Sequence, residues 1–199
     1  TTITKRNMTK LEAIGDFAIK HGAVAYHVFF MVPTGRGKHI KGDEISPLEY
    51  EEAFNKLYEF QLTSSLRMKP TCAPHYYRVL RERSSQKKHE LPSDYDIGSL
   101  TKGCLAGQGV CFISNKGEVF GCGYLPISAG NIKKESFEKI WRESFLFETM
   151  RDTSKLEGKC GICEFKNVCG GCRARAYAST GNYLEGEPEC IYQPLTVKY

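Results

Sequence analysis

The second half of the chain carries a dense set of cysteines at spacings that suit a soft metal or a metal cluster. The residues are Cys104, Cys111, Cys122, then Cys160, Cys163, Cys169 and Cys172 in a C-x2-C-x5-C-x2-C run, and finally Cys190. Thiolates two residues apart on a tight turn can bind one metal centre, which is why C-x2-C recurs in zinc and iron–sulfur sites. The pattern indicates a metal-binding framework, and the metal decides the function.

Three kinds of site compete for these cysteines. Disulfides need an oxidising compartment, whereas this chain has an odd count of nine cysteines and neither an apolar signal segment nor a transmembrane run, which favours the cytoplasm. Structural zinc suits four thiols, but its C-x2-C pairs usually lie roughly 15 residues apart, and here only five residues separate them. Eight cysteines divide into two sets of four, the ligand number of a cubane iron–sulfur cluster. Iron–sulfur binding is the preferred interpretation.

The order of the cysteines resembles the SPASM domain, the C-terminal auxiliary iron–sulfur module of many radical S-adenosylmethionine (SAM) enzymes. Gly117, which four residues separate from Cys122, belongs to that pattern. The resemblance implies one or two auxiliary [4Fe–4S] clusters, the first held by Cys104, Cys111, Cys122 and Cys172, the second by Cys160, Cys163, Cys169 and Cys190. The family more often has C-x3-C where this chain has C-x2-C between Cys169 and Cys172, a departure that bears on the role of Cys172.

Flanking segments narrow the resemblance to the haem-biosynthesis branch of radical SAM proteins. They are residues 27–38, 69–81, 103–126 and 158–192. They are most similar to haem synthases of the sirohaem-dependent pathway, which decarboxylate two propionates of iron-coproporphyrin III to vinyl groups. This implies an iron-porphyrin substrate, an electron donor such as a ferredoxin or flavodoxin, and an auxiliary cluster that accepts an electron. The alternatives are a didecarboxysirohaem deacetylase, a peptide-modifying SPASM maturase and a non-catalytic iron–sulfur electron carrier.

The chain also lacks a motif that a radical SAM enzyme needs. No three of its nine cysteines have the C-x3-C-x2-C spacing that binds the catalytic cluster, and the sequence opens on Thr1 without an initiator Met. We therefore expect the C-terminal part of a longer protein, whose missing part binds SAM and a further [4Fe–4S] cluster. This segment alone should be inactive.

Alternating strand and helix patterns in the first half predict an α/β fold. Strands are expected at residues 1–5, 23–32 and 67–72, and helices from Leu11 to Gly22, at 49–61 and at 74–84. The continuous apolar stretch 23–32 predicts a parallel strand covered on both faces. By resemblance, residues 1–90 would be the closing units of a partial TIM-like β/α barrel.

The second half is expected to form a separate cysteine-rich module at residues 103–199. A linker is predicted at 91–102, within a polar stretch from Ser84 to Ser99. The Ser114–Gly117 turn predicts a hairpin that brings Cys111 and Cys122 together. A helix is predicted within 131–150 and a short one at 172–179. The residues expected to face inward are Leu48, Phe54, Leu57, Tyr58, Phe137, Ile140, Trp141 and Phe145.

Candidate substrate contacts follow the predicted strands, because β/α barrels place functional groups at the carboxyl ends of strands. They are Arg36, Lys38, His39, Cys72, His75 and Tyr76. The alternatives are an ordinary solvated loop for the first three, an inert buried thiol for Cys72, and core packing for the aromatic residues. Cys72 is not expected to be needed for cluster content.

Charge adds a modest constraint. The net charge of +5 is scattered among acidic residues, which excludes a basic stripe for nucleic acid and fits either a solvated surface or a polyanionic small substrate. Arg173 and Arg175 follow Cys172 directly. They are predicted either to hydrogen-bond cluster sulfurs or carboxylates, or to lie on the surface.

Overall fold

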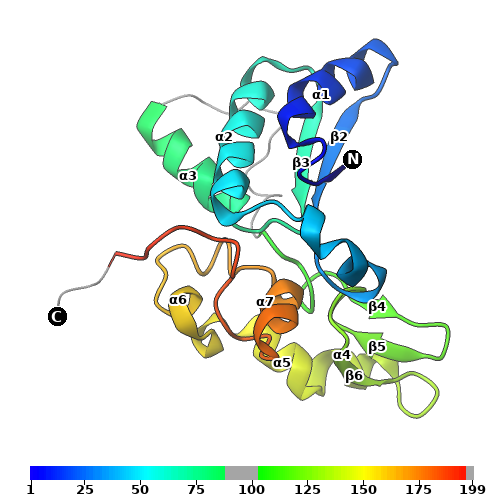
Figure 1. The fold of residues 1–199 in the computed structure, drawn as a ribbon. Coiled ribbons are helices and arrows are strands. Elements are labelled where there is room, and N and C mark those ends of the chain that lie inside the picture. Colours follow the sequence, from blue (N-terminus) through cyan, green and yellow to red (C-terminus); the bar gives the residue numbers. More distant parts are fainter. Residues whose placement is uncertain (88–102, 196–199) are drawn as a thin grey trace.

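A small parallel sheet forms from the alternating elements of the first half (Figure 1). The computed structural model describes residues 1–87 and 103–195. Strands β1 (Thr2–Ile3), β2 (Ala25–Phe30) and β3 (Arg67–Thr71) lie side by side in chain order. Both pairs are parallel, with Val28 opposite Pro70. Parallel neighbours need crossover connections, which here contain α1 (Leu11–Lys20) and α2 (Pro47–Thr63).

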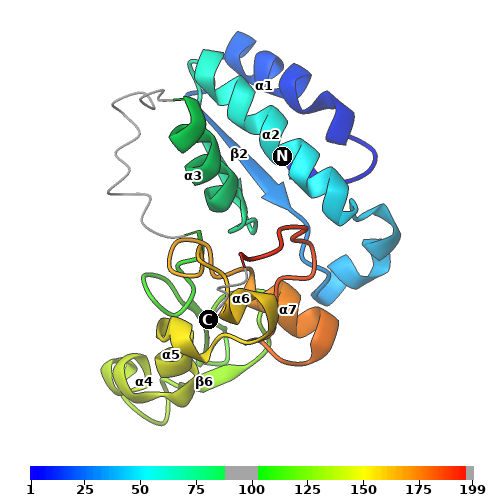
Figure 2. The same cartoon turned by 90° about the vertical axis from the view of Figure 1, so that its left-hand side faces the viewer.

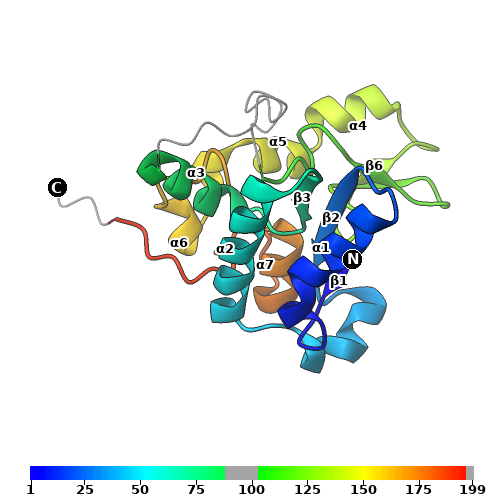
Figure 3. The ribbon, with the colours of Figure 1, turned by 90° about the horizontal axis from the view of Figure 1, so that it is seen from above.

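One face of this sheet is covered by helices. Helices α1, α2 and α3 (Tyr76–Lys87) follow one another around the same side of the strands (Figures 2 and 3). Tyr26, Val28 and Phe30 of β2 are buried, whereas His27 is exposed and Phe29 is half-buried. Successive strand residues point to opposite faces, so the described residues cover only one face of β2. The apolar stretch had predicted that both faces would be covered.

Local sequence signals explain where α2 begins. The Ser46 hydroxyl accepts a hydrogen bond from Glu49 N (3.3 Å), and the Glu49 carboxylate accepts one from Ser46 N (2.6 Å). Pro47 occupies the first turn, where its missing N–H costs nothing. Phe54 and Tyr58 then reach the core fully buried. This reciprocal cap fixes the start of α2 at Pro47, two residues before the start that the sequence predicted.

The second half is built on a short antiparallel sheet. Strands β4 (Phe112–Ile113), β5 (Glu118–Phe120) and β6 (Ser128–Asn131) pair in chain order. The predicted hairpin is present, with Gly117 at φ 84° in its turn, a left-handed conformation that favours glycine. The helices that pack beside the sheet or carry the cysteine run are α4 (Phe137–Glu143), α5 (Phe145–Arg151), α6 (Gly158–Gly161) and α7 (Arg173–Thr180).

Short 3-10 segments complete the described chain. They are η1 (Met8–Lys10), η2 (Gly35–Asp43) and η3 (Thr153–Lys155). The segment η2 contains Arg36, Lys38 and His39, for which an ordinary solvated loop was the alternative to substrate contact. No helix among the described residues has the length and apolar character that crossing a membrane requires.

Several sequence expectations are corrected by the structure. The single helix expected within 131–150 is two helices, because Ser144 adopts an extended backbone and its hydroxyl caps α5 at Phe147 N. Leu48, Phe137 and Phe145 were expected to face inward, but they are 71%, 43% and 73% exposed, and each lies in the first turn of its helix. Helix α3 continues to Lys87, past the predicted start of the polar stretch, and the predicted linker 91–102 lies outside the described residues.

Replacement of Ser46 by Ala should destabilise the full-length protein by about 1 kcal/mol, because it removes the hydroxyl that satisfies an unpaired N–H of the first helical turn. Urea unfolding followed by circular dichroism measures this. Ser65→Ala is the matched control, since Ser65 is exposed after the end of α2. Equal free energies of unfolding for the two variants would contradict the role of the cap.

Candidate metal centre

Four cysteines from the end of the chain line one pocket. They are Cys160 at the end of α6, Cys163 and Cys169 in the loop that follows, and Cys190 near the C-terminus. His75 and Arg78 line the same pocket. The second ligand set implied by the resemblance is therefore brought together by the fold.

Backbone and side-chain donors point at two of these sulfurs. Glu187 N donates to Cys160 Sγ (3.3 Å) and Gly171 N donates to Cys169 Sγ (3.4 Å). Arg173 Nη2 lies 3.8 Å from Cys160 Sγ. A side chain at Gly171 would place its Cβ 2.9 Å from Glu187 Cβ, so only glycine lets the backbone approach the sulfurs this closely. Such donors stabilise negative charge on sulfur and tune a bound cluster.

A second group of thiols lies between the two halves of the molecule. Cys72, Cys104 and Cys122 pack around the same apolar group of residues as the buried Cys172. Cys111, the fourth member of the first set implied by the resemblance, packs instead against Val119, Ile140 and Phe147. The structure thus brings together three members of that set, and adds Cys72 to them.

Burial keeps these thiols in the neutral form when no metal balances their charge. Burial raises the pKa of Cys72 and of Cys104 to about 12 in each case, and that of Cys169 well above its usual value. Thiolates are the metal-binding form, so their charge requires a compensating cation and binding is coupled to folding. The donor set therefore fits a soft, positively charged iron centre.

The spacing of the donors bears on the choice between zinc and a cluster. Among the described residues, no three His, Cys, Asp or Glu side chains converge on one point that would hold a single metal ion. In a cubane cluster each thiolate binds a different iron, so the sulfurs surround the cluster instead of meeting at one atom.

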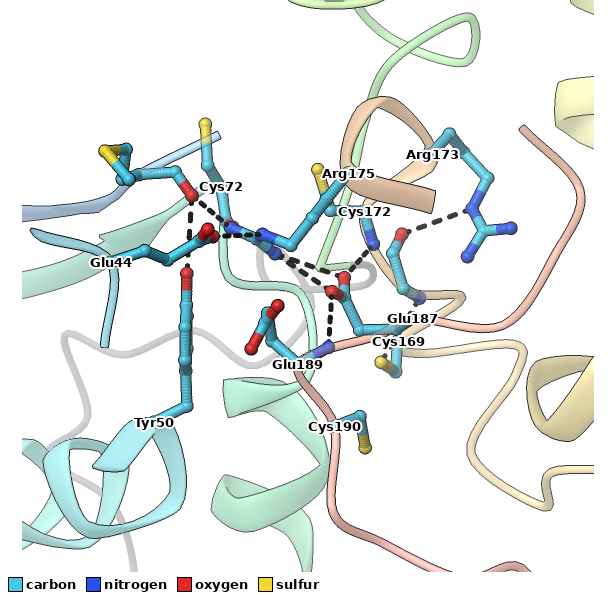
Figure 4. A network of polar contacts seen from close by, with 12 residues as sticks. Glu44, Tyr50, Cys72, Cys169, Cys172, Arg173, Arg175, Glu187, Glu189 and Cys190 are labelled. Carbon is cyan, nitrogen blue, oxygen red and sulfur yellow. Dashed lines mark hydrogen bonds and ion pairs between the residues drawn. The ribbon is translucent and has the colours of Figure 1, made fainter. Parts of the chain in front are cut away.

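A buried ion pair holds the two groups of thiols in place (Figure 4). Arg175 Nη1 donates to both carboxylate oxygens of Glu187, at 3.1 and 3.2 Å, and the two side chains are each 1% exposed. Arg175 Nη2 donates to Met31 O (3.0 Å) and Cys72 O (2.8 Å), in the segments that follow β2 and β3. Glu187 Oε2 accepts a hydrogen bond from Cys172 N (2.7 Å). One guanidinium thus connects α7 to the sheet.

The pair remains charged despite its burial. Burial by itself would raise the pKa of Glu187, but the charge of Arg175 and the hydrogen bond from Cys172 N lower it below its usual value. Burial likewise opposes the cation of Arg175, and the charge of Glu187 reverses this and raises the pKa. The sequence placed Arg175 near the clusters or on the surface. It gave no signal for Glu187 beyond its position three residues before Cys190.

The six candidate substrate residues do not lie together in the structure. Lys38 lines a cavity of about 730 Å³, whereas Arg36 and His39, on the same segment η2, are exposed and do not line it. His75 and Tyr76 are buried, and Tyr76 donates to Gln61 Oε1 (3.0 Å). Burial lowers the pKa of His75 to about 3, so it is neutral. Of the six candidates, only Lys38 lies on this cavity, and Cys72 lies with the thiols.

The cavity lies between η2, the hairpin and α7. Lys38 and Cys122 are part of its lining, together with four aromatic residues, Phe112, Phe120, Tyr124 and Tyr177. Phe112 and Tyr124 are 46% and 44% exposed. The volume falls within the roughly 300–1,000 Å³ typical of small-molecule sites.

Comparisons with known proteins agree with this arrangement. Residues 104–173 match the SPASM family model, described as an iron–sulfur cluster-binding domain. The chain is 51% identical to an "AdoMet-dependent heme synthase" of Methanosarcina barkeri, over 98% of this chain and 55% of that protein. It is 44% identical to one of Nitratidesulfovibrio vulgaris, over 98% and 53% respectively. The chain therefore spans about half the length of the curated relatives it matches.

A solved structure has a similar fold. It is the crystal structure of Streptococcus suis SuiB bound to S-adenosylmethionine, with a TM-score of 0.58 and 17% identity. The match covers 99% of this chain and 43% of that one. At this identity the likeness concerns the fold alone, a mixed α/β arrangement that includes the cysteine-rich module.

Loss of the Arg175 side chain should destabilise the full-length protein by roughly 3–5 kcal/mol, because Glu187 would remain buried without its cation. Urea unfolding of Arg175→Ala measures this. The Arg175→Ala/Glu187→Ala double variant should lose at least about 1 kcal/mol less than the sum of the single variants.

Arg142→Ala is the control for that cycle, since Arg142 is 71% exposed beside Glu138. It should change the free energy of unfolding by less than about 0.5 kcal/mol. Strict additivity of the two buried substitutions would show that the pair does not act as a unit.

Anaerobically purified protein should contain iron in excess of zinc, and Cys163→Ala should lower its iron and sulfide by roughly one cluster of four irons. The reason is that Cys163 shares its pocket with three other thiols. Elemental analysis of the parent and the variant checks both points. Two zinc ions per chain and no iron after anaerobic reconstitution would contradict the assignment.

Proposed function

The chain is a radical SAM–SPASM sequence related to the AdoMet-dependent haem synthases, and on that premise we propose that the full-length protein converts iron-coproporphyrin III to haem. The observation that carries the proposal is the aromatic cavity with Lys38 at its wall and Cys122 in its lining. The reaction is an oxidative decarboxylation of two propionates to vinyl groups.

Residues 1–90 are, in this proposal, the closing units of a partial β/α barrel, and residues 103–199 are the auxiliary module. The parallel order of β1, β2 and β3 with helices on one face supports it. The opposite face carries His27, which pairs with the exposed Lys69. Exposed polar residues on that face suit the interior of a barrel whose other strands lie in the rest of the protein, where SAM and a further cluster would bind.

The cavity matches the chemistry of an iron porphyrin. A macrocycle has a broad apolar face, which packs against aromatic rings such as Phe112, Phe120 and Tyr124. Iron-coproporphyrin also carries propionates, and the Lys38 ammonium provides a cation for one of them. Arg36 lies two residues away on η2 and offers a second cation at the exposed edge.

The proposed reaction sets the requirements for the site. Removal of a hydrogen atom from the β-carbon of a propionate leaves a carbon radical. Cleavage of the bond to the carboxylate then gives a vinyl group, carbon dioxide and one electron. When bound, an auxiliary iron–sulfur cluster supplies one-electron redox chemistry. The aromatic walls would hold the macrocycle, and Lys38 would hold a carboxylate in position.

Cofactors and partners follow from the same proposal. The SPASM match supports iron–sulfur binding by the second half of the chain. We assign one cluster to the pocket of Cys160, Cys163, Cys169 and Cys190, and a second to the thiols around Cys172. A ferredoxin or flavodoxin would supply the electrons that SAM cleavage consumes.

The full-length protein, supplied with SAM and a reductant, should convert iron-coproporphyrin III to haem. Lys38→Ala should weaken substrate binding roughly fivefold, since a partly exposed ion pair contributes about 1 kcal/mol. Product analysis by mass spectrometry and absorbance titration of the porphyrin measure the two effects. Arg36→Ala should weaken binding in the same direction.

Lys20→Ala is the matched control, because Lys20 is an exposed lysine at the end of α1. Its porphyrin affinity should equal that of the parent protein. A deacetylated porphyrin formed from didecarboxysirohaem, with no vinyl product from iron-coproporphyrin III, would replace the proposed reaction with the neighbouring one. Modification of a peptide without turnover of either porphyrin would replace the substrate class.

A further inference from the structure

The thiol group around Cys172 has a member that the family pattern does not supply. Cys72 directly follows β3 in the first half of the chain, yet it packs with Cys104 and Cys122 against the apolar group that contains Cys172. Cys72 thus shares one apolar group with all three thiols, although it comes from the other half of the chain.

Cys111 occupies the other face of the hairpin. Phe112 pairs with Phe120, and Ile113 pairs with Val119. Successive strand residues point to opposite faces, so Cys111, beside Phe112, lies on the face of Val119, against which it packs. Cys122 lines the cavity together with Phe112 and Phe120, on the opposite face. The hairpin that was expected to bring Cys111 and Cys122 together separates their side chains.

The backbone of Cys72 provides a second, independent observation. Its φ angle is 58°, and it is the one residue other than glycine with a positive φ in the described part of the chain. A left-handed conformation costs an L-residue with a side chain roughly 1–2 kcal/mol. Arg175 Nη2 holds the Cys72 carbonyl at 2.8 Å. The fold therefore holds this residue in an unfavourable conformation, and its side chain packs against the apolar group of the module.

From these placements we infer that Cys72, and not Cys111, is the fourth protein ligand of the iron–sulfur cluster bound by Cys104, Cys122 and Cys172. Each thiol binds as a thiolate and releases its proton when the cluster assembles. This ligand set joins the sheet of the first half to the cysteine-rich module through a cluster. It differs from the expectation from sequence that Cys72 is not needed for cluster content.

The inference is tested by comparing Cys72→Ala and Cys111→Ala in the full-length protein after anaerobic reconstitution. Cys72→Ala should either lose roughly four irons per chain or keep them and gain one iron that binds cyanide. Cys111→Ala should change neither quantity. Elemental analysis gives the iron and sulfide content, and electron–nuclear double resonance with ¹³C-labelled cyanide counts cyanide-binding irons relative to the parent protein.

A change in iron content or in cyanide-binding iron that occurs only in Cys72→Ala supports the inference. The inference is overturned if that change occurs only in Cys111→Ala, in both variants, or in neither. Cys72→Ser, which offers an oxygen ligand of similar size, should restore the iron content but shift the electron paramagnetic resonance signal of that cluster. The signal of the cluster in the Cys160 pocket serves as the folding check in every variant. No porphyrin is present, so this outcome is independent of the proposed reaction.

Discussion

The buried pair of Arg175 and Glu187 is the interaction on which the arrangement of both thiol groups depends. A guanidinium in a site from which water is excluded must satisfy its donors there. Arg175 satisfies Nη1 and Nη2 with one carboxylate and two backbone carbonyls, those of Met31 and Cys72, whereas its Nε makes no hydrogen bond among the described residues and lies 4.0 Å from Glu44 Oε1. Glu187 in turn accepts a hydrogen bond from the backbone N–H of Cys172, the residue just before the helix that contains Arg175. The same four contacts therefore set the position of α7, the ends of two strands and a cysteine.

The two groups of thiols lie close together at the turn between Cys169 and Cys172. Cys169 and Cys172 are three residues apart, yet they belong to different groups, with Gly170 and Gly171 between them in left-handed conformations. The glycines turn the backbone, and the N–H groups of Gly171 and Cys172 point to Cys169 Sγ and Glu187 respectively. A C-x2-C pair that resembles a single metal knuckle is thus divided by its own turn between two groups of thiols.

The sequence predicted the strands, helices and turns whose formation depends on residues that are neighbours in the chain. The β/α alternation and the turn at Gly117 each depend on neighbouring residues, and the structure confirms them. The second helix was also predicted, although it begins at Pro47 and not at Glu49. Glu187 and Cys72 acquire their surroundings through contacts between residues far apart in the chain. A glutamate before a cysteine, or a cysteine after a strand, carries no local mark of such contacts. The break at Ser144 was missed because the apolar spacing continues across it.

The contacts of Arg175 also limit how freely this module can be exchanged between proteins. Its two acceptors in the first half are main-chain carbonyls, so neither Met31 nor Cys72 needs a particular side chain for that bond. Alignment of sequences cannot reveal whether another barrel offers the same pair of carbonyls. A chimera that joins these cysteines to a different β/α scaffold would have to match strand ends in space as well as the side chains of Glu44 and Tyr50, which lie beside Arg175. Compatibility between the two parts thus depends on backbone geometry that a sequence does not display.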